Sequence, residues 1–195
     1  AGVGADWGNI TFGRQKGAPG FLADWTDVSL SDGYGNEALG AKTDTFATNR
    51  AGSVMKYSGL FNGFQIDTSY KFDGGDTEET TSKDSDAAYG AALAYTFPFN
   101  LALGTAYNVG IRDKSGEEDA KLWLLSAKYD NKAVYAALSY ADGSDFLATG
   151  KDHTGWEAAL GYNFESGFGL MALWNKQKVE QSGKSDYDSI DYYTL

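Results

Sequence analysis

Apolar and polar side chains alternate one by one along several stretches of this chain. In residues 64–72 the apolar set is Phe64, Ile66, Tyr70 and Phe72, and the polar set is Gln65, Asp67, Ser69 and Lys71. On a strand these two sets face opposite sides, whereas a helix would scatter them around its circumference. The same period recurs in residues 89–97, 123–130, 134–140, 156–164 and 168–174. The sequence therefore predicts an all-β protein built from amphipathic strands.

The connections between these stretches alternate between two sizes. Short connections lie at residues 60–63, 98–100, 131–132 and 165–167, and long polar ones at residues 73–86, 112–120, 142–154 and 181–189. Short turns at one end and long loops at the other are typical of a transmembrane antiparallel up-and-down β-barrel. Aromatic residues near the strand ends, such as Tyr89, Trp123 and Trp156, fit the girdles that border a membrane. The alternative is a soluble β-sandwich or lipocalin-like barrel with these aromatics in its core.

Composition excludes several classes of protein. The formal net charge is −11, with 27 acidic against 16 basic residues, whereas binding to nucleic acid requires a basic surface. The chain has no Cys, which excludes disulfide frameworks, thiolate metal sites and cysteine nucleophiles. It also lacks the run of about 20 apolar residues that a membrane-spanning helix needs.

One connection breaks the pattern. More than thirty residues without clean alternation separate the strand near residues 9–13 from the strand near residues 52–58. A loop this long is uncommon in a compact domain and is usually functional. Between residues 17 and 49 the charged residues are Asp24, Asp27, Asp32, Glu37, Asp44 and Lys42. The inward positions of the strands are mostly Gly, Ala, Ser and Asn, which are too small to fill a barrel and favour an open lumen that the loop can enter.

Several local motifs occur in the order known from one protein family. They are Phe12-Gly13-Arg14, Asp24-Trp25-Thr26-Asp27-Val28, Leu60-Phe61-Asn62-Gly63-Phe64, Lys128-Tyr129-Asp130 and Ala133-Val134-Tyr135-Ala136-Ala137. With these motifs the chain resembles the general porins of Gram-negative outer membranes, the trimeric, sixteen-stranded OmpC/OmpF-like family. The resemblance extends over most of the chain.

The resemblance implies a fold and a function. We expect one porin domain over residues 1–195, with residues 15–49 as a constriction loop folded into the lumen. About ten strands are expected from the alternation, so the resemblance implies an incomplete chain. It also implies a non-enzymatic homotrimeric channel in the cell outer membrane, in contact with lipid and lipopolysaccharide. Ions and small hydrophilic solutes would diffuse through it, with weak cation selectivity.

The resemblance also implies site residues. In such porins, arginines on the barrel wall face carboxylates on the infolded loop. Arg14 matches a wall arginine and Asp27 a loop carboxylate. Ser58 stands where the next wall arginine falls, so Lys56, two residues earlier on the same face, is the candidate substitute. The predicted constriction residues are Arg14, Asp27, Asp32, Glu37 and Lys56.

Other functions remain as alternatives. A ten-stranded outer-membrane hydrolase would need a general base, and His153 beside Asp152 is the only histidine, in a predicted external loop. A closed barrel that serves as an anchor or receptor is a third class. The acidic residues Asp73, Asp76, Asp84 and Asp86 offer oxygen ligands for calcium but lack the spacing of a calcium-binding loop. We expect no metal or cofactor, although divalent ions could bridge these residues to lipopolysaccharide.

Overall fold

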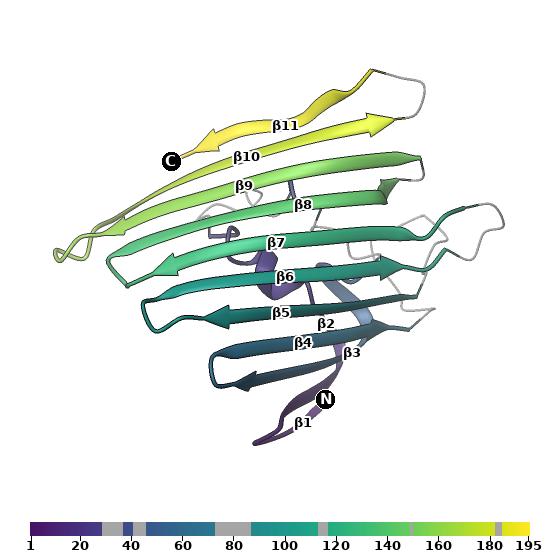
Figure 1. Ribbon diagram of the computed structural model, residues 1–195, viewed down its shortest axis with the longest axis horizontal. Helices are drawn as coiled ribbons and strands as arrows, with labels where there is room; N and C mark the ends of the chain where they lie inside the picture. Colours follow the sequence, from purple (N-terminus) through teal and green to yellow (C-terminus); the bar gives the residue numbers. More distant parts are fainter. Residues whose placement is uncertain (29–36, 41–45, 73–86, 113–116, 149, 182–184) are drawn as a thin grey trace.

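The protein forms a single antiparallel sheet of eleven strands (Figure 1). The computed structural model describes residues 1–28, 37–40, 46–72, 87–112, 117–148, 150–181 and 185–195. The strands are β1 (Gly2–Ala5), β2 (Gly8–Lys16), β3 (Arg50–Phe61), β4 (Phe64–Lys71), β5 (Ala88–Thr96), β6 (Leu101–Gly110), β7 (Ala120–Asp130), β8 (Val134–Ala148), β9 (Lys151–Asn163), β10 (Gly169–Gln181) and β11 (Tyr187–Thr194). A short helix, α1 (Gly20–Ala23), follows β2. The described residues contain no helix with the length and apolar character that a membrane crossing needs.

Each strand pairs with the strands that precede and follow it in the chain, so the sheet is an up-and-down meander. Within the described residues it is open, because β1 pairs only with β2 and β11 only with β10. The tight turns of the hairpins from β3 to β10 lie at one end of the sheet, on the left of Figure 1. The turn from β3 to β4 has Asn62 and Gly63 at positive φ, 48° and 88°, as two-residue hairpin turns require. The predicted fold class is confirmed, and so are the short turns at this end of the sheet.

At the other end of the sheet, strands extend into residues that the sequence analysis predicted as loops. The structure has eleven strands rather than about ten, and β11 overlaps the loop predicted at residues 181–189. The long loop predicted at residues 142–154 is wrong, because β8 continues to Ala148 and β9 begins at Lys151. Here the outward residues Asp142 and Asp152 are exposed and polar. The pairing of β8 with β9 also shifts register between Ser144 and Ala148, and such an irregularity interrupts the period of two that identifies a strand.

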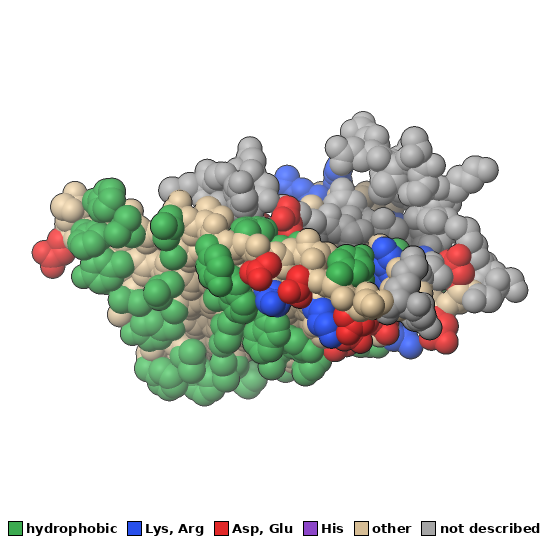
Figure 2. All heavy atoms as spheres, turned by 90° about the horizontal axis from the view of Figure 1, so that it is seen from above, with side chains coloured by type: hydrophobic (Ala, Val, Ile, Leu, Met, Phe, Trp, Pro, Cys, Tyr) green, Lys and Arg blue, Asp and Glu red, His purple; other side chains and the backbone are tan. Residues whose placement is uncertain are grey.

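The outer face of the sheet carries an apolar band. Its leucines include Leu93, Leu125, Leu138 and Leu160, which are all exposed. Aromatic residues border the band and contact one another across strands, as in the pairs Tyr140–Trp156 and Phe64–Tyr95, with ring centroids 4.7 Å and 4.5 Å apart. Figure 2 shows hydrophobic side chains gathered along one side of the sheet and charged side chains toward the end with the long connections. This distribution matches a wall whose outer face contacts lipid.

The orientation of the wall predicts unequal effects for one substitution at two leucines. Leu160 is 61% exposed within the outer apolar band, and Leu60 is 73% exposed on the face that carries Gln65 and Asp67. An arginine on the lipid-facing side of a barrel costs about 2–4 kcal/mol near the bilayer midplane. We therefore expect Leu160→Arg to lower the free energy of unfolding in lipid vesicles by roughly this amount. The matched control, Leu60→Arg, should change it little, and equal losses would contradict the assigned faces.

Candidate functional site

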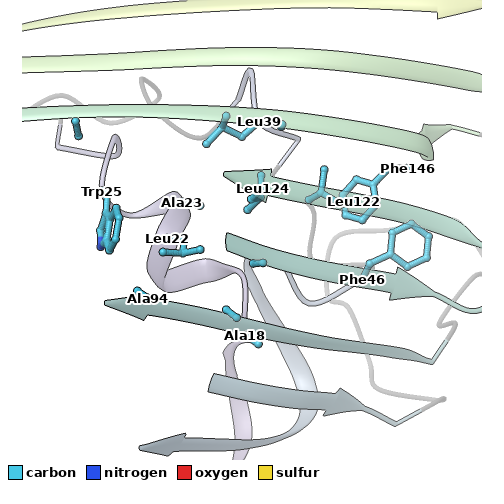
Figure 3. Packing of buried hydrophobic residues seen from close by; sticks show 14 of the residues in the cluster. Ala18, Leu22, Ala23, Trp25, Leu39, Phe46, Ala94, Leu122, Leu124 and Phe146 are labelled. Atoms are coloured by element: carbon cyan, nitrogen blue, oxygen red, sulfur yellow. The ribbon is translucent and has the colours of Figure 1, made fainter. Parts of the chain in front are cut away.

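The connection between β2 and β3 folds back onto the inner face of the sheet. This inner segment comprises residues 17–49, since Gln15 and Lys16 belong to β2. Its described apolar side chains, including Leu22, Trp25 and Phe46, are buried in one cluster with residues of β5 to β10. Figure 3 shows α1 lying against these strands, with Leu22 and Trp25 directed at them. The apolar side chains of the segment therefore pack against inward residues of the strands, as in a protein core.

Small residues of the wall make this close approach possible. A Cβ atom at Gly155 would lie 1.8 Å from the carbonyl oxygen of Ala38. At Gly104 it would lie 2.4 Å from Leu22 Cδ2, which is shorter than the sum of the two van der Waals radii. The sequence interpretation took the small inward residues as the lining of an open lumen. The structure shows that many of them instead provide room for the inner segment.

Side chains of the wall bind the backbone of the segment, in whose described residues the four-residue helix α1 is the only helix or strand. The Ala18 N–H donates a 2.8 Å hydrogen bond to Ser69 Oγ on β4. Asn108 Nδ2 on β6 donates to the carbonyl oxygen of Phe46 over 3.0 Å. Tyr135 on β8 donates from its hydroxyl to the carbonyl oxygen of Trp25 over 2.5 Å. Buried backbone groups require such partners, so the wall holds the segment at these three positions.

The strongest attachment is at Glu157 on β9, whose side chain is 1% exposed. One carboxylate oxygen accepts a 2.7 Å bond from Thr26 Oγ1, and the other accepts a 3.0 Å bond from the Ala38 N–H. Gln177 on β10 donates from Nε2 to the carbonyl oxygen of Ala38 at 3.0 Å. One carboxylate therefore joins two parts of the segment that are twelve residues apart in the chain.

Cationic side chains hold the segment through its aromatic rings and carboxylates. Lys128 Nζ on β7 lies 5.0 Å from the centre of the Trp25 ring, and Arg112 lies over the Phe46 ring at 5.4 Å. Lys16, at the end of β2, forms an ion pair with Asp24 just after α1. Cations over aromatic faces are favourable, more so where water is excluded. These contacts supplement the backbone hydrogen bonds.

The predicted constriction residues occupy separate elements. Arg14 is exposed on β2, where the register with β3 shifts, and Asp27 is exposed shortly after α1. Glu37 accepts a 3.4 Å hydrogen bond from the Tyr192 hydroxyl on β11. Lys56 lies on the inner side of β3, but its ammonium is 2.6 Å from Asp67 of the wall. Asp32 lies outside the described residues.

The structure contradicts the surroundings expected for His153. This residue was predicted in an external loop but lies on β9, where it is 1% exposed. Its ring lies beneath the inner segment, 2.8 Å from where a Cβ at Gly40 would be. Asp152, the neighbour proposed to orient it, is exposed and faces the opposite side of the strand. The arrangement of base and carboxylate that a hydrolase would need is therefore not formed by these two residues.

Metal ligands do not gather in the part of the chain that the structure describes. No group of three or more His, Asp or Glu side chains placed to hold a metal ion occurs among these residues. The acidic residues considered for calcium, Asp73, Asp76, Asp84 and Asp86, lie outside the described residues.

Sequence reasoning missed the residues that anchor the segment, namely Ser69, Asn108, Tyr135, Glu157 and Gln177. Each occupies an inward position of a strand, and for Asn108, Tyr135 and Glu157 the neighbouring inward positions are small residues. A polar residue at such a position also fits a lumen filled with water. The one distinctive signal was Glu157, a carboxylate between the small inward residues Gly155 and Ala159.

Comparison with known proteins gives a consistent result. Residues 1–194 match the family of Gram-negative porins. The chain is 30% identical over 169 residues to outer membrane protein U of Vibrio parahaemolyticus, an alignment that covers 83% of this chain and 45% of that protein. The chain spans about half the length of the curated relatives it matches.

Solved structures show the same fold. Salmonella typhi OmpF, solved in complex with daunomycin, superposes with a TM-score of 0.80 at 22% identity, over 97% of this chain and 62% of that one. The trimer form of Vibrio cholerae OmpT gives a TM-score of 0.68 at 18% identity, over 96% of this chain and 60% of that one.

The role of Glu157 can be tested with a reporter cysteine, because the chain has no Cys of its own. In an Ala38→Cys background, Glu157→Leu removes both acceptors and should raise the rate of labelling by a small thiol reagent about tenfold or more, since hydrogen bonds to charged groups contribute roughly 1.5–3 kcal/mol. Glu157→Gln is the matched control, because its oxygen can accept from the Ala38 position while its amide donates to Thr26. Equal labelling rates in all three proteins would show that Glu157 does not hold the segment.

Proposed function

Since the chain belongs to the Gram-negative porin family, we propose that it forms part of the wall and the constriction of a general diffusion porin. Ions and small hydrophilic solutes would cross the cell outer membrane through its water-filled lumen, down their gradients. The observation that carries the proposal is the inner segment, whose described parts are held on the inner face of an amphipathic wall. A segment bound inside a barrel reduces the open cross-section at its own level.

The proposed constriction is asymmetric in charge. The inner segment, with Asp24, Asp27, Asp32, Glu37 and Asp44 against Lys42, is acidic. The wall contributes Arg14 and Lys56, as proposed from the resemblance. Selectivity in such a pore depends on its width and on the charges that line it. Because carboxylates outnumber cations on the segment, we propose a weak preference for cations.

We also propose the assembly and the surroundings of the whole protein. The apolar outer face fits outer-membrane lipid, and the charged strand ends beyond the aromatic residues fit the headgroups of lipopolysaccharide. A homotrimer is proposed because OmpT of Vibrio cholerae, which shares the fold, is known in a trimer form. A nucleic-acid partner is not proposed for a chain with a net charge of −11.

Membership of a porin family agrees with the expectation that the chain is not an enzyme. The hydrolase alternative depended on His153 with Asp152, and these side chains lie on opposite faces of β9. The anchor alternative depended on a closed interior. A conductance measurement separates it from the porin proposal, because an anchor would produce no channel.

Shortening the inner segment should widen the pore. We expect deletion of about ten residues around positions 27–37 to raise single-channel conductance in planar bilayers and to admit larger sugars, because this part of the segment would occupy the lumen. A deletion of equal length within residues 73–86 serves as the control. Unchanged conductance and an unchanged size limit in the first variant would contradict a constriction at the segment.

Charge at the constriction should set the sign of selectivity. We expect a reversal potential of cation-selective sign across a KCl gradient, weaker as salt rises, because charges are screened over about 8 Å at physiological salt. Asp27→Asn should reduce the preference and Arg14→Ala should increase it. An anion-selective sign in the parent channel at low salt would contradict the proposed charge asymmetry.

A further inference from the structure

Lys56 and Asp67 form an ion pair within the wall itself. Lys56 Nζ on β3 lies 2.6 Å from Asp67 Oδ2 on β4. The side chain of Asp67 is 1% exposed and that of Lys56 is 16% exposed, so the pair is largely shielded from solvent. Both residues lie on the inner face, the face on which Ser69 binds the start of the inner segment.

The register of the two strands places the charge of Lys56 closer to Ser58 than its sequence position suggests. Ser69 lies directly opposite Lys56, whereas Asp67 lies directly opposite Ser58. The ion pair is therefore diagonal, and the lysine extends toward the level of Ser58. Ser58 is the position at which the resemblance places a wall arginine. The ammonium of Lys56 therefore lies near Ser58, but there it contacts the carboxylate of Asp67.

This pairing changes how the wall acts on a permeating ion. An unpaired ammonium on the wall would attract anions, and its field would oppose that of the acidic inner segment. An ammonium and a carboxylate in contact produce only a dipole, whose field falls off faster than that of a single charge. The nearby hollow is lined by Asp6, Asn9, Ser58 and Gln65, so water and ions can approach the pair from the inner side.

We propose that Asp67 is a selectivity-determining residue of the channel, which acts by neutralising Lys56. The inference rests on the proposed porin function and adds a residue to it. With Asp67 in place, the Lys56–Asp67 pair carries no net charge, and Lys56 does not oppose the carboxylates of the inner segment. Without it, Lys56 becomes an uncompensated cation beside the segment.

Reversal potentials of the whole channel in planar bilayers test the proposal. In Asp67→Asn the side chain keeps its size while Lys56 loses its counter-charge. A unit charge roughly 8 Å from the ion path in water changes the local concentrations of cations and anions about twofold in opposite senses, so the cation-to-anion permeability ratio should fall about fourfold. The double variant Asp67→Asn with Lys56→Gln restores a neutral pair, and its ratio should equal that of the parent.

A control separates the pair from the total charge of the chain. Asp188→Asn removes the same charge from an exposed ion pair, in which Asp188 Oδ2 lies 3.2 Å from Lys176 Nζ on the outer side of β10. This variant should keep the cation-to-anion permeability ratio of the parent channel.

The outcomes are distinct. A parental ratio in Asp67→Asn channels of normal conductance would overturn the inference and leave the porin proposal intact. A parent that forms no channel would overturn both. If Asp67→Asn does not assemble, Lys56→Gln decides in its place: it leaves the Asp67 carboxylate uncompensated, so the cation-to-anion permeability ratio should rise about fourfold, and a parental ratio overturns the inference.

Discussion

The structure depends on one requirement, that an irregular segment buried against a wall must find hydrogen-bond partners for its backbone. In its described residues the inner segment has one helix of only four residues, so regular secondary structure satisfies few of their backbone groups. The wall provides the partners through side chains on several strands, among them Ser69, Asn108 and Glu157. These contacts occur at the beginning, the middle and the end of the segment. A long connection thereby acquires a defined position, which a constriction needs.

The same alternation of side chains that builds the strands also separates the two environments of the wall. Residues such as Leu93 and Leu160 face outward, while their neighbours Ala92 and Ala159 lie buried on the inner face. Large apolar residues suit the outward face because lipid tails offer no hydrogen-bond partners to polar side chains. The backbone groups of the strands are satisfied by pairing within the sheet. Inward residues are small where the segment packs and polar where it must be bound. The ion pair of Lys56 with Asp67 belongs to this inner side.

Sequence reasoning predicted the strands and turns in which one physical requirement determines the order of residue types. The faces of β4 and the turn at Asn62-Gly63 were predicted because burial in lipid enforces a strict period and a tight turn needs positive φ. It failed at the ends of β8 and β9 and at β11, because acidic residues on the outer face and register shifts in the pairing interrupt the period. It assigned Arg14, Asp27 and Lys56 by resemblance alone, and it could not find Asp67 as the partner of Lys56. That contact depends on the register of β3 with β4, which a period of two leaves undetermined.

The central claim is that the inner segment is bound to the wall through its backbone. Hydrogen exchange of single amides in the lipid-embedded protein tests this claim without any substitution. The account predicts that the amides of Ala18 and Ala38, bonded to Ser69 and Glu157, exchange at least about a thousandfold more slowly than those of an unstructured peptide. Exchange of both amides at the unstructured rate, while the amides of β6 and β7 stay protected, would contradict it.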